Sequence, residues 1–196
     1  MRFVLKRRNA SFCGLYFVDR SYLLLMYLFR LASMPDFTVG YHILHESALH
    51  MVALGRHQWD ALYPQEEDVR HDIASHHAYV VEVDGKVVAY GAVSFEGEPS
   101  YEHLQGTWLT GGKYAVVHRC AVALSERGKG LSTFFFRQVE DLCKDHQCGS
   151  IRIDTNYDNV EMLGLLNALG YQRCGICHYH RNGSTIERIA FEKVLK

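Results

Sequence analysis

The sequence lacks a strong net charge, a long hydrophobic run and a regular spacing of cysteines. Its 21 Lys and Arg residues nearly balance its 22 Asp and Glu residues, which gives a net charge of −1. Nucleic acids are bound largely through the attraction of Lys and Arg to phosphate, so this balance argues against a nucleic-acid partner. The apolar patch from Tyr22 to Leu31 is interrupted by Arg30 and is too short to cross a bilayer as a helix.

The six cysteines are irregularly spaced, which predicts reduced thiols and argues against a disulfide framework. The 196 residues are 48% hydrophobic and 22% charged, the balance of an ordinary soluble domain with a real core. We therefore expect one cytoplasmic domain whose partner is neither a membrane nor a nucleic acid.

The first 33 residues differ from the rest of the chain. Residues 6–8 are basic and precede the apolar patch, which is the outline of a secretion signal. Leu31-Ala32-Ser33 makes only a weak cleavage site, and Met34-Pro35-Asp36 would make a natural start for a cytosolic domain. We expect residues 1–33 to be an extension outside the fold and residues 34–196 to be the domain. A membrane or export role for the extension is the alternative.

Hydrophobic periodicity and turn residues predict a series of strands and helices. The expected strands are Thr38–Leu44, Ala78–Val83, Val87–Phe95, Tyr114–Val122, Ser150–Asp154, Tyr171–His178 and Ile186–Val194. The expected helices are Glu46–Leu62, Glu66–Ala74, Leu131–His146 and a helix that begins near Asp158 and ends at Gly170. Residues 96–113 are expected to form a long ordered loop, and such loops tend to be functional.

A glycine-rich turn, Arg127 to Ser132, joins the strand at Tyr114–Val122 to the helix that follows. The free N–H groups and the dipole of a helix N-terminus favour an anion, most often a phosphate. A Walker A loop would need Ser or Thr after Lys129, and a dinucleotide fingerprint would need a glycine at Thr133. Neither of these two loops fits, whereas a third phosphate-binding motif does.

The run RGKGLS resembles motif A of the GNAT superfamily of acetyl-CoA-dependent N-acetyltransferases, Gln/Arg-x-x-Gly-x-Gly/Ala. Arg127 takes the first position and Gly130 the fourth, while Ser132 replaces the last small residue. Residues 151–175 look like motif B of the same family, with Asn159 and Gly170 in its frame. The resemblance covers the chain from about Thr38 onward. It implies an α/β fold of the α+β type, with a mixed central sheet of about six to seven strands, helices on both faces and a splayed cofactor cleft.

The resemblance also implies an activity, namely transfer of acetyl from acetyl-CoA to a primary amine by direct attack. The acceptor would be a small molecule, a protein N-terminus or a lysine. The implied cofactor-binding residues are Cys120, Val122, Arg127, Gly128, Lys129, Gly130, Leu131, Ser132, Asn156 and Asn159. Positioning two bound reactants would supply much of the rate, and no metal is needed.

Two departures from the family pattern concern the proton transfers. Many members place a Tyr in the motif B helix to protonate the leaving thiolate, and the matching position is Leu166. The strand Tyr114–Val122 lacks the carboxylate that some members use as a base. The candidate base is His118, or a Glu of the long loop, Glu98 or Glu102, acting through water. The alternative interpretation of His118 is a hydrogen-bonded core histidine.

Aromatic residues would line the acceptor pocket, namely Trp59, Tyr63, Tyr101 and Trp108. A separate motif, Cys174-Gly-Ile-Cys177-His178, fits the haem-attachment pattern. In a strand its two cysteines would point to opposite faces, so we expect neither haem nor zinc. The alternative to an enzyme is a non-catalytic acetyl-CoA-binding module, which Leu166 suggests. Either protein could be a homodimer.

Overall fold

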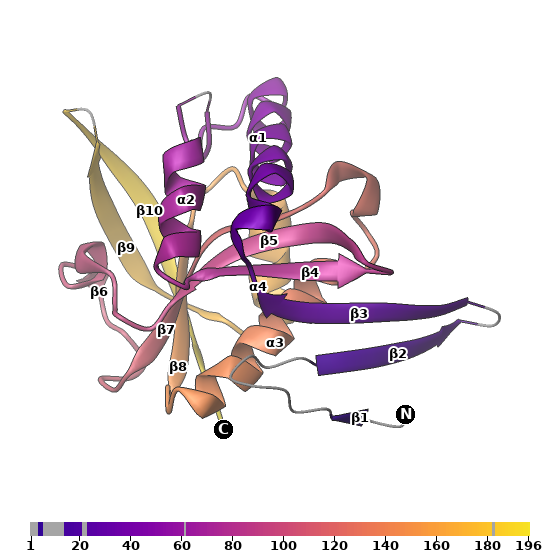
Figure 1. Ribbon diagram of the computed structural model, residues 1–196. Coiled ribbons are helices and arrows are strands. Elements are labelled where there is room, and N and C mark those ends of the chain that lie inside the picture. The colour runs from indigo at the N-terminus through magenta and orange to yellow at the C-terminus, as the bar shows by residue number, and fades with distance from the viewer. Residues whose placement is uncertain (1–3, 6–13, 21–22, 61, 182) are drawn as a thin grey trace.

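The computed structural model describes residues 4–5, 14–20, 23–60, 62–181 and 183–196 (Figure 1). Its strands are β1 (Val4–Leu5), β2 (Gly14–Arg20), β3 (Leu23–Leu31), β4 (Ala78–Val83), β5 (Lys86–Ser94), β6 (Gln105–Gly106), β7 (Tyr114–Val122), β8 (Ser150–Thr155), β9 (Gln172–Arg181) and β10 (Ser184–Val194). Its α-helices are α1 (Phe37–Ala53), α2 (Glu66–Ala74), α3 (Leu131–Asp145) and α4 (Val160–Ala168). Short 3-10 turns lie at Met34–Asp36, Pro99–Tyr101 and Leu124–Glu126.

One mixed sheet runs through the molecule in the order β1-β2-β3-β4-β5-β7-β8-β10-β9-β6. Among the described residues its parallel pairing is confined to β7 and β8, and the other pairs are antiparallel. The seven strands from β4 to β10 correspond to the six to seven that the sequence predicts, and β1–β3 add to them at one edge. The expected α+β fold is therefore confirmed, with a wider sheet.

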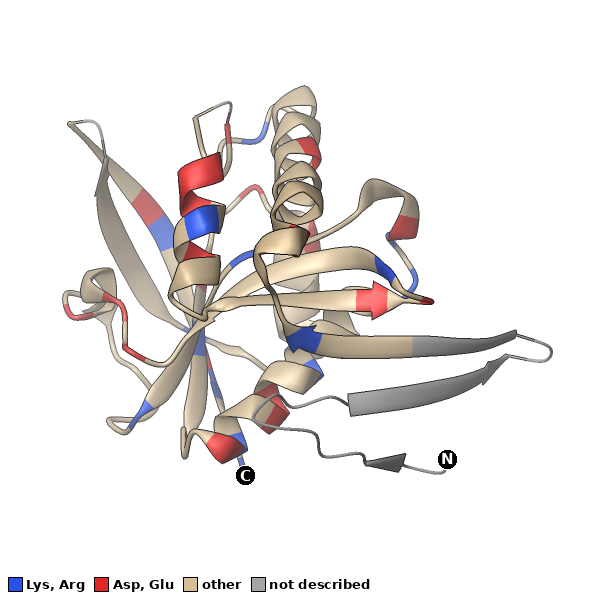
Figure 2. Ribbon diagram, viewed as in Figure 1, with Lys and Arg blue, Asp and Glu red and all other residues tan. Residues whose placement is uncertain are grey.

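Helices cover both faces of the sheet (Figure 1). On one face, α3 and α4 contribute buried residues such as Phe135 and Leu166 to the largest core cluster. On the other, α1 and α2 pack Leu44 and Val69 against Val80 and Tyr90 of β4 and β5. Charges of both signs alternate along the solvent side of α2 (Figure 2). Each strand between the helices is thus buried on two sides, which explains the nearly continuous apolar run of β7.

The sheet splays open between β7 and β8. The two strands pair only from Tyr114↔Ser150 to Val116↔Arg152, although β7 continues to Val122. On its other side, β7 pairs Ala92↔His118 and then Tyr90↔Ala121, so β7 carries one extra residue. Arg119 lies in this bulge with a φ of 48°, in the left-handed region. Bulges bend a strand and increase its twist, so β7 leaves its neighbour at this point.

The first expected strand, Thr38–Leu44, is wrong, because these residues belong to α1. The helix follows directly on the 3-10 turn Met34–Asp36. A capping box precedes that turn, in which Ser33 N–H and Oγ both donate to Asp36 Oδ2, at 2.8 and 2.9 Å. The buried positions of the helix, Ile43, Leu44, Ser47 and Ala48, recur with helical spacing. The alternation over Thr38–Leu44 was too short to distinguish the two periods, and packing against the sheet decides for a helix.

Residues 27–33 pack against the rest of the fold, while the expected domain boundary between residues 33 and 34 stays a prediction. Tyr27 to Leu31 pair with β4, and Phe29 is 1% exposed in the core. Arg30 donates to both oxygens of Asp36, at 2.7 and 2.8 Å, which lowers the pKa of the Asp36 carboxyl to about 2. That residues further upstream lie outside the fold stays a prediction. None of the described helices is both long and apolar enough to cross a membrane.

Candidate functional site

The glycine turn between β7 and α3 presents unobstructed backbone. Gly128 and Gly130 have φ values of 78° and 81°, and Gly130 is the residue that precedes the first turn of α3. No side chain caps this helix end. A Cβ built at either glycine would meet no atom within 4 Å, so the space in front of the turn is open. The arrangement leaves N–H groups of the first turn available to an anion.

A cavity of about 340 Å³ lies against this turn and extends along the end of β7. The residues that line it and were predicted to bind a cofactor are Cys120, Val122, Arg127, Gly128, Gly130, Leu131, Ser132 and Asn159. The other two predicted residues, Lys129 and Asn156, are not among its lining residues. Lys129 Nζ is paired with Glu126 at 2.8 Å, and the Asn156 N–H donates to Gln58 Oε1 at 3.1 Å. The roles of these two residues in cofactor binding stay predictions.

Arg127 supplies positive charge beside the turn. Its guanidinium donates to Ser47 Oγ at 3.3 Å and forms no ion pair with a carboxylate of the described residues. Burial lowers the pKa of Arg127. A half-buried guanidinium without a carboxylate partner, next to free N–H groups, favours a ligand that carries negative charge.

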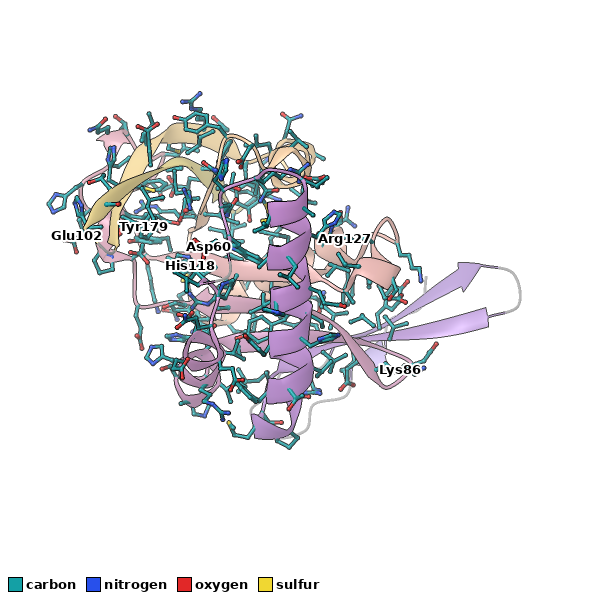
Figure 3. The ribbon with its side chains drawn as sticks, turned by 90° about the horizontal axis from the view of Figure 1, so that it is seen from above. Asp60, Lys86, Glu102, His118, Arg127 and Tyr179 are labelled. Atoms are coloured by element: carbon teal, nitrogen blue, oxygen red, sulfur yellow. The ribbon has the colours of Figure 1, made fainter. Side chains whose placement is uncertain are left out.

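A second cavity, of about 370 Å³, occupies the gap where β7 leaves β8. It shares Met51, Trp59, Cys120, Asn159 and Met162 with the first cavity. Seen from above, Arg127 lies on one side of α1 and His118 and Tyr179 lie on the other (Figure 3). The two cavities therefore meet at the bulge of β7, near Cys120.

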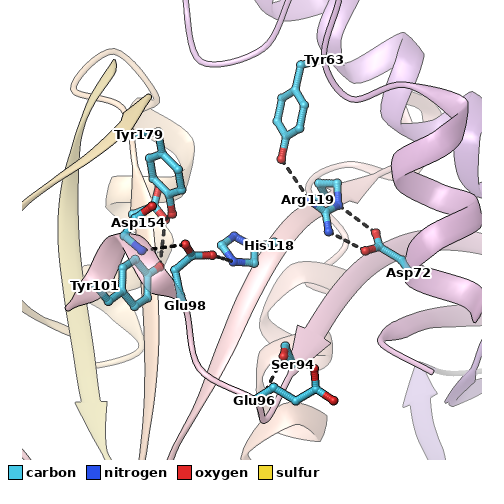
Figure 4. Close-up of polar contacts among 11 residues, drawn as sticks. Tyr63, Asp72, Ser94, Glu96, Glu98, Tyr101, His118, Arg119, Asp154 and Tyr179 are labelled. Atoms are coloured by element: carbon cyan, nitrogen blue, oxygen red, sulfur yellow. Dashed lines mark hydrogen bonds and ion pairs between the residues drawn. The ribbon is translucent and has the colours of Figure 1, made fainter. Parts of the chain in front are cut away.

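His118 and Glu98 form a hydrogen-bonded pair in the second cavity (Figure 4). His118 Nε2 lies 3.1 Å from Glu98 Oε2, and Glu98 also accepts the Ser100 N–H at 3.0 Å. Burial would raise the pKa of Glu98, but the hydrogen bonds from His118 and Ser100 outweigh it and lower the pKa. An ionised carboxylate only accepts hydrogen bonds, so the Nε2–H of His118 is the donor to Glu98, and Nδ1 takes no part in this bond.

A buried ion pair holds the bulge of β7. Arg119 donates to Asp72 Oδ2 and Oδ1 of α2, at 2.8 and 2.5 Å, and to the Tyr63 hydroxyl at 3.1 Å. Asp72 is 1% exposed and also accepts the Tyr90 hydroxyl at 2.9 Å. The sequence predicts that a charged Arg in a buried strand needs a partner, and this expectation is confirmed.

Comparison with known proteins identifies the family. The sequence model of the acetyltransferase (GNAT) family matches residues 42–171. This chain belongs to the GNAT family of acetyltransferases. It is accordingly an acyltransferase enzyme, and the resemblance seen in motifs A and B is confirmed.

Solved structures of GNAT proteins share the fold. A GNAT-family acetyltransferase of Streptococcus agalactiae is 31% identical, with a TM-score of 0.75, over 93% of this chain and 99% of that one. YncA of Salmonella typhimurium, solved with its cofactor acetyl-CoA, is 15% identical, with a TM-score of 0.62, over 87% and 95% of the two chains. The ribosomal-protein-S18-alanine N-acetyltransferase of Escherichia coli is 13% identical, with a TM-score of 0.61, over 87% and 95%. A search of curated proteins finds no match.

The aromatic residues predicted to line the acceptor pocket of this GNAT chain divide into two pairs. Trp59 and Tyr63 line the second cavity. Tyr101 and Trp108 are not among its lining residues, and their role stays a prediction. They pack against each other in a small core cluster with ring centroids 5.1 Å apart, and Trp108 Nε1 donates to the Tyr101 carbonyl at 3.1 Å. Buried tyrosines and tryptophans satisfy their polar atoms in this way.

The two glutamates of the long loop that are candidate bases also differ in position. Glu98 reaches His118, whereas Glu102 is exposed and lines a separate shallow hollow with Pro99. Leu166, at the position of the missing motif B Tyr, is 0% exposed in the main core. The side chains of α4 that line the first cavity are Glu161, Met162 and Leu165. Of the candidate bases, His118 and Glu98 line the second cavity, and Glu102 is not among its lining residues.

Several cavity residues escaped sequence reasoning, namely Gln58, Asp154, Tyr179 and Arg188. Gln58 Oε1 accepts from Thr155 Oγ1 and Asn159 Nδ2, both at 2.8 Å, so the segment after α1 is tied to the start of α4. The sequence signals that could have indicated these residues were the position of Asp154 in the alternating pattern of β8 and the polar residues near the Asn182-Gly183 turn. In the described part of the chain, no group of three His, Cys, Asp or Glu side chains is placed to hold a metal ion.

Proposed function

We propose that this GNAT enzyme transfers acetyl from acetyl-CoA to a primary amine by direct attack. The observation that carries the proposal is the meeting of two cavities at the β7 bulge, one beside the open glycine turn and the other beside the Glu98–His118 pair. An acyl donor in the first cavity and an amine in the second would bring their reacting atoms together near Cys120. Holding two reactants in this way supplies much of the rate.

The first cavity fits CoA chemically. The open space over Gly128 and Gly130 would accept the pyrophosphate on N–H groups of residues 128–132, with Arg127 as a nearby positive charge. Pantetheine would run along the unpaired edge of β7, where backbone groups from Val117 to Val122 have no partner in β8. Bound there, acetyl-CoA supplies an activated acyl carbon and a thiolate leaving group.

In the second cavity, His118 acts as the base that frees the amine. A protonated amine has no lone pair, so it must lose a proton before it attacks the thioester carbon. Nδ1 of His118 takes that proton, while Glu98 fixes the ring tautomer through Nε2. The C–N bond then forms and the C–S bond breaks. The overall reaction converts an ammonium and acetyl-CoA into an amide, CoA and one proton.

Departure of CoA needs no Tyr on α4. A thiol with a pKa of about 8.5 leaves tolerably as its thiolate. Burial of Leu166 in the core means that its position does not face the reaction, so the absence of a Tyr there removes no group from the cavity. A cytoplasmic location is part of the proposal, in keeping with free thiols at the five described cysteines. A homodimer remains a prediction.

The sequence left a second candidate, a non-catalytic acetyl-CoA-binding module, which only the missing motif B Tyr suggested. Both candidates bind the cofactor, and only the enzyme releases CoA when an amine is present. A panel of amines, including amino acids, polyamines and peptides, is scored for free CoA by a thiol reagent, with acetyl-CoA alone as the control. Release with any amine above that control supports the enzyme. Tight binding of acetyl-CoA by calorimetry without release from any amine supports the module.

A further inference from the structure

Asp154 of β8 presents one carboxylate oxygen to the second cavity without a hydrogen-bond partner. The hydroxyls of Tyr101 and Tyr179 both donate to Oδ1, at 2.8 and 2.6 Å (Figure 4). Among the described residues, Oδ2 accepts no hydrogen bond and no cation lies within ion-pair distance of Asp154. Burial and the nearby carboxylates of Asp154 and Glu98 raise the pKa of Tyr179, so this phenol stays a donor. Asp154 is thus held in place as a carboxylate with a free oxygen.

Arg188 of β10 presents the complementary charge to the same cavity. Its guanidinium donates to the backbone carbonyls of Glu187 and Gln58, at 3.0 and 3.2 Å. No carboxylate of the described residues pairs with it. Arg119, the other guanidinium of this cavity, is already neutralised by Asp72. Arg188 is therefore the cation of the cavity that remains available to an anionic group of a ligand.

The register of the sheet places these two opposite charges on one face. Asp154 pairs with Ala190, and Arg188 lies two residues from Ala190 on the same strand, so its side chain leaves the same face. Such diagonal neighbours lie about 7–8 Å apart. The two groups form no ion pair with each other, which leaves room for a small polar molecule between them.

We propose that the acceptor is a small zwitterionic amine of the α-amino acid type. Its ammonium lies on Asp154 Oδ2, beside the Glu98–His118 pair that removes the proton, and its carboxylate lies on Arg188. Its side chain extends toward Trp59 and Tyr63. The assignment rests on the proposed acetyl transfer and adds the chemical class of the acceptor, whose carboxylate sets the orientation of the amine.

The test compares amines that differ only in the carboxylate. L-α-amino acids, with phenylalanine, methionine and leucine among them, are each paired with the decarboxylated amine and the carboxamide, and CoA release is measured for all three. We expect the best amino acid to exceed its decarboxylated amine in kcat/KM by about 10- to 100-fold, the range for one charge-assisted hydrogen-bonded pair. The carboxamide should resemble the amine.

Substitutions test which residues cause the preference for an amine that carries a carboxylate. Arg188→Gln should remove the preference for the carboxylate, mainly by raising KM. Asp154→Asn should raise KM for amino acids and plain amines alike. Arg173→Gln is the matched control, because Arg173 is exposed on β9 and lines neither cavity, so the preference should persist. Acetyl-CoA affinity, measured by calorimetry on every variant, verifies that each is folded.

The outcomes separate this inference from the proposed function. Equal kcat/KM for amino acids and their decarboxylated amines, or a preference that survives Arg188→Gln, would overturn the acceptor class while acetyl transfer stands. CoA release with none of the amines, despite tight acetyl-CoA binding, would overturn acetyl transfer and this inference with it.

Discussion

The cavity at the glycine turn and the cavity between β7 and β8 differ in the part of the chain that lines them. At the first, the proposed anion-binding groups come from consecutive residues, Arg127 to Ser132, at the start of α3. The second gathers side chains from segments as distant as Glu98, His118, Asp154 and Arg188. Under the proposed function, the cofactor would be bound by local backbone geometry, whereas the acceptor would be bound by side chains that only the tertiary fold assembles.

The two cavities also differ in the interactions that maintain their shape. The glycine turn needs only two left-handed residues and the start of a helix. The acceptor side depends on buried polar contacts, notably Arg119 with Asp72 and Asp154 with its two tyrosines. Substitutions on the first side should therefore affect cofactor affinity alone. Substitutions on the second side should affect turnover, acceptor binding or stability and leave cofactor affinity unchanged.

The largest expected effect is on turnover. His118→Ala should lower kcat by about 10²- to 10⁴-fold, the usual contribution of a general base, with acetyl-CoA affinity unchanged. The measurements are CoA release at saturating amine and calorimetric titration of acetyl-CoA. His103→Ala, at an exposed histidine outside both cavities, is the control. Unaltered turnover would show that His118 has only a structural role.

Breaking the ion pair at the bulge tests what holds the acceptor side. Asp72→Asn leaves the buried Arg119 charge without its carboxylate and should cost about 3–5 kcal/mol of unfolding free energy. Denaturant unfolding measures the loss, and Glu67→Gln, an exposed position on the same helix, should change stability by less than about 0.5 kcal/mol. Equal stability of the two variants would mean that the bulge does not depend on this pair.

On the cofactor side, Gly130→Asp should weaken acetyl-CoA binding by at least about 100-fold, or about 2.7 kcal/mol. The new carboxylate would stand where the pyrophosphate is expected and repel it. Gly85→Asp is a matched control, because Gly85 has a similar φ of 78° and equally open surroundings in the β4–β5 turn. Unchanged calorimetric affinity in Gly130→Asp would show that the pyrophosphate binds elsewhere.

The smallest expected effect concerns pH and stability on the acceptor side. The pKa of Glu98 is lowered from 4.5 in the folded protein, so its contribution to stability is present above about pH 4.5 and is lost as the pH falls through the folded value. Glu98→Gln should therefore cost about 1 kcal/mol at pH 7, and the gap from the unsubstituted protein should close below pH 4.5. Unfolding free energies measured between pH 3 and 7 show this. In Glu102→Gln, at an exposed residue, no such pH-dependent gap should appear.

Much of the fold could be predicted from local signals. Three features depend only on residues that are close together in the sequence, and the structure contains each of them. They are the hairpin at Asp84-Gly85, the apolar run of β7 and the helix boundaries at Glu66–Ala74. The error at Thr38–Leu44 arose because seven residues can fit both periods, and only packing of Ile43 and Leu44 on the sheet distinguishes them. The placement of Phe29 in the core and of the half-buried Arg30 at its edge also required long-range contacts, with Tyr79 and Glu82.

The sequence by itself determined the cofactor side, because an anion-binding turn is formed by consecutive residues. These are two glycines, a neighbouring Arg and the first turn of a helix. The acceptor side was decided by the tertiary structure. Glu98 meets His118 across 20 residues of chain, and Asp154 and Arg188 face one another only through the register of β8 and β10. Tyr101 and Trp108 looked equally available in the sequence, yet packing buried them elsewhere. Spacing along the chain fixes local backbone geometry, but the pairing of distant side chains depends on strand register and helix packing.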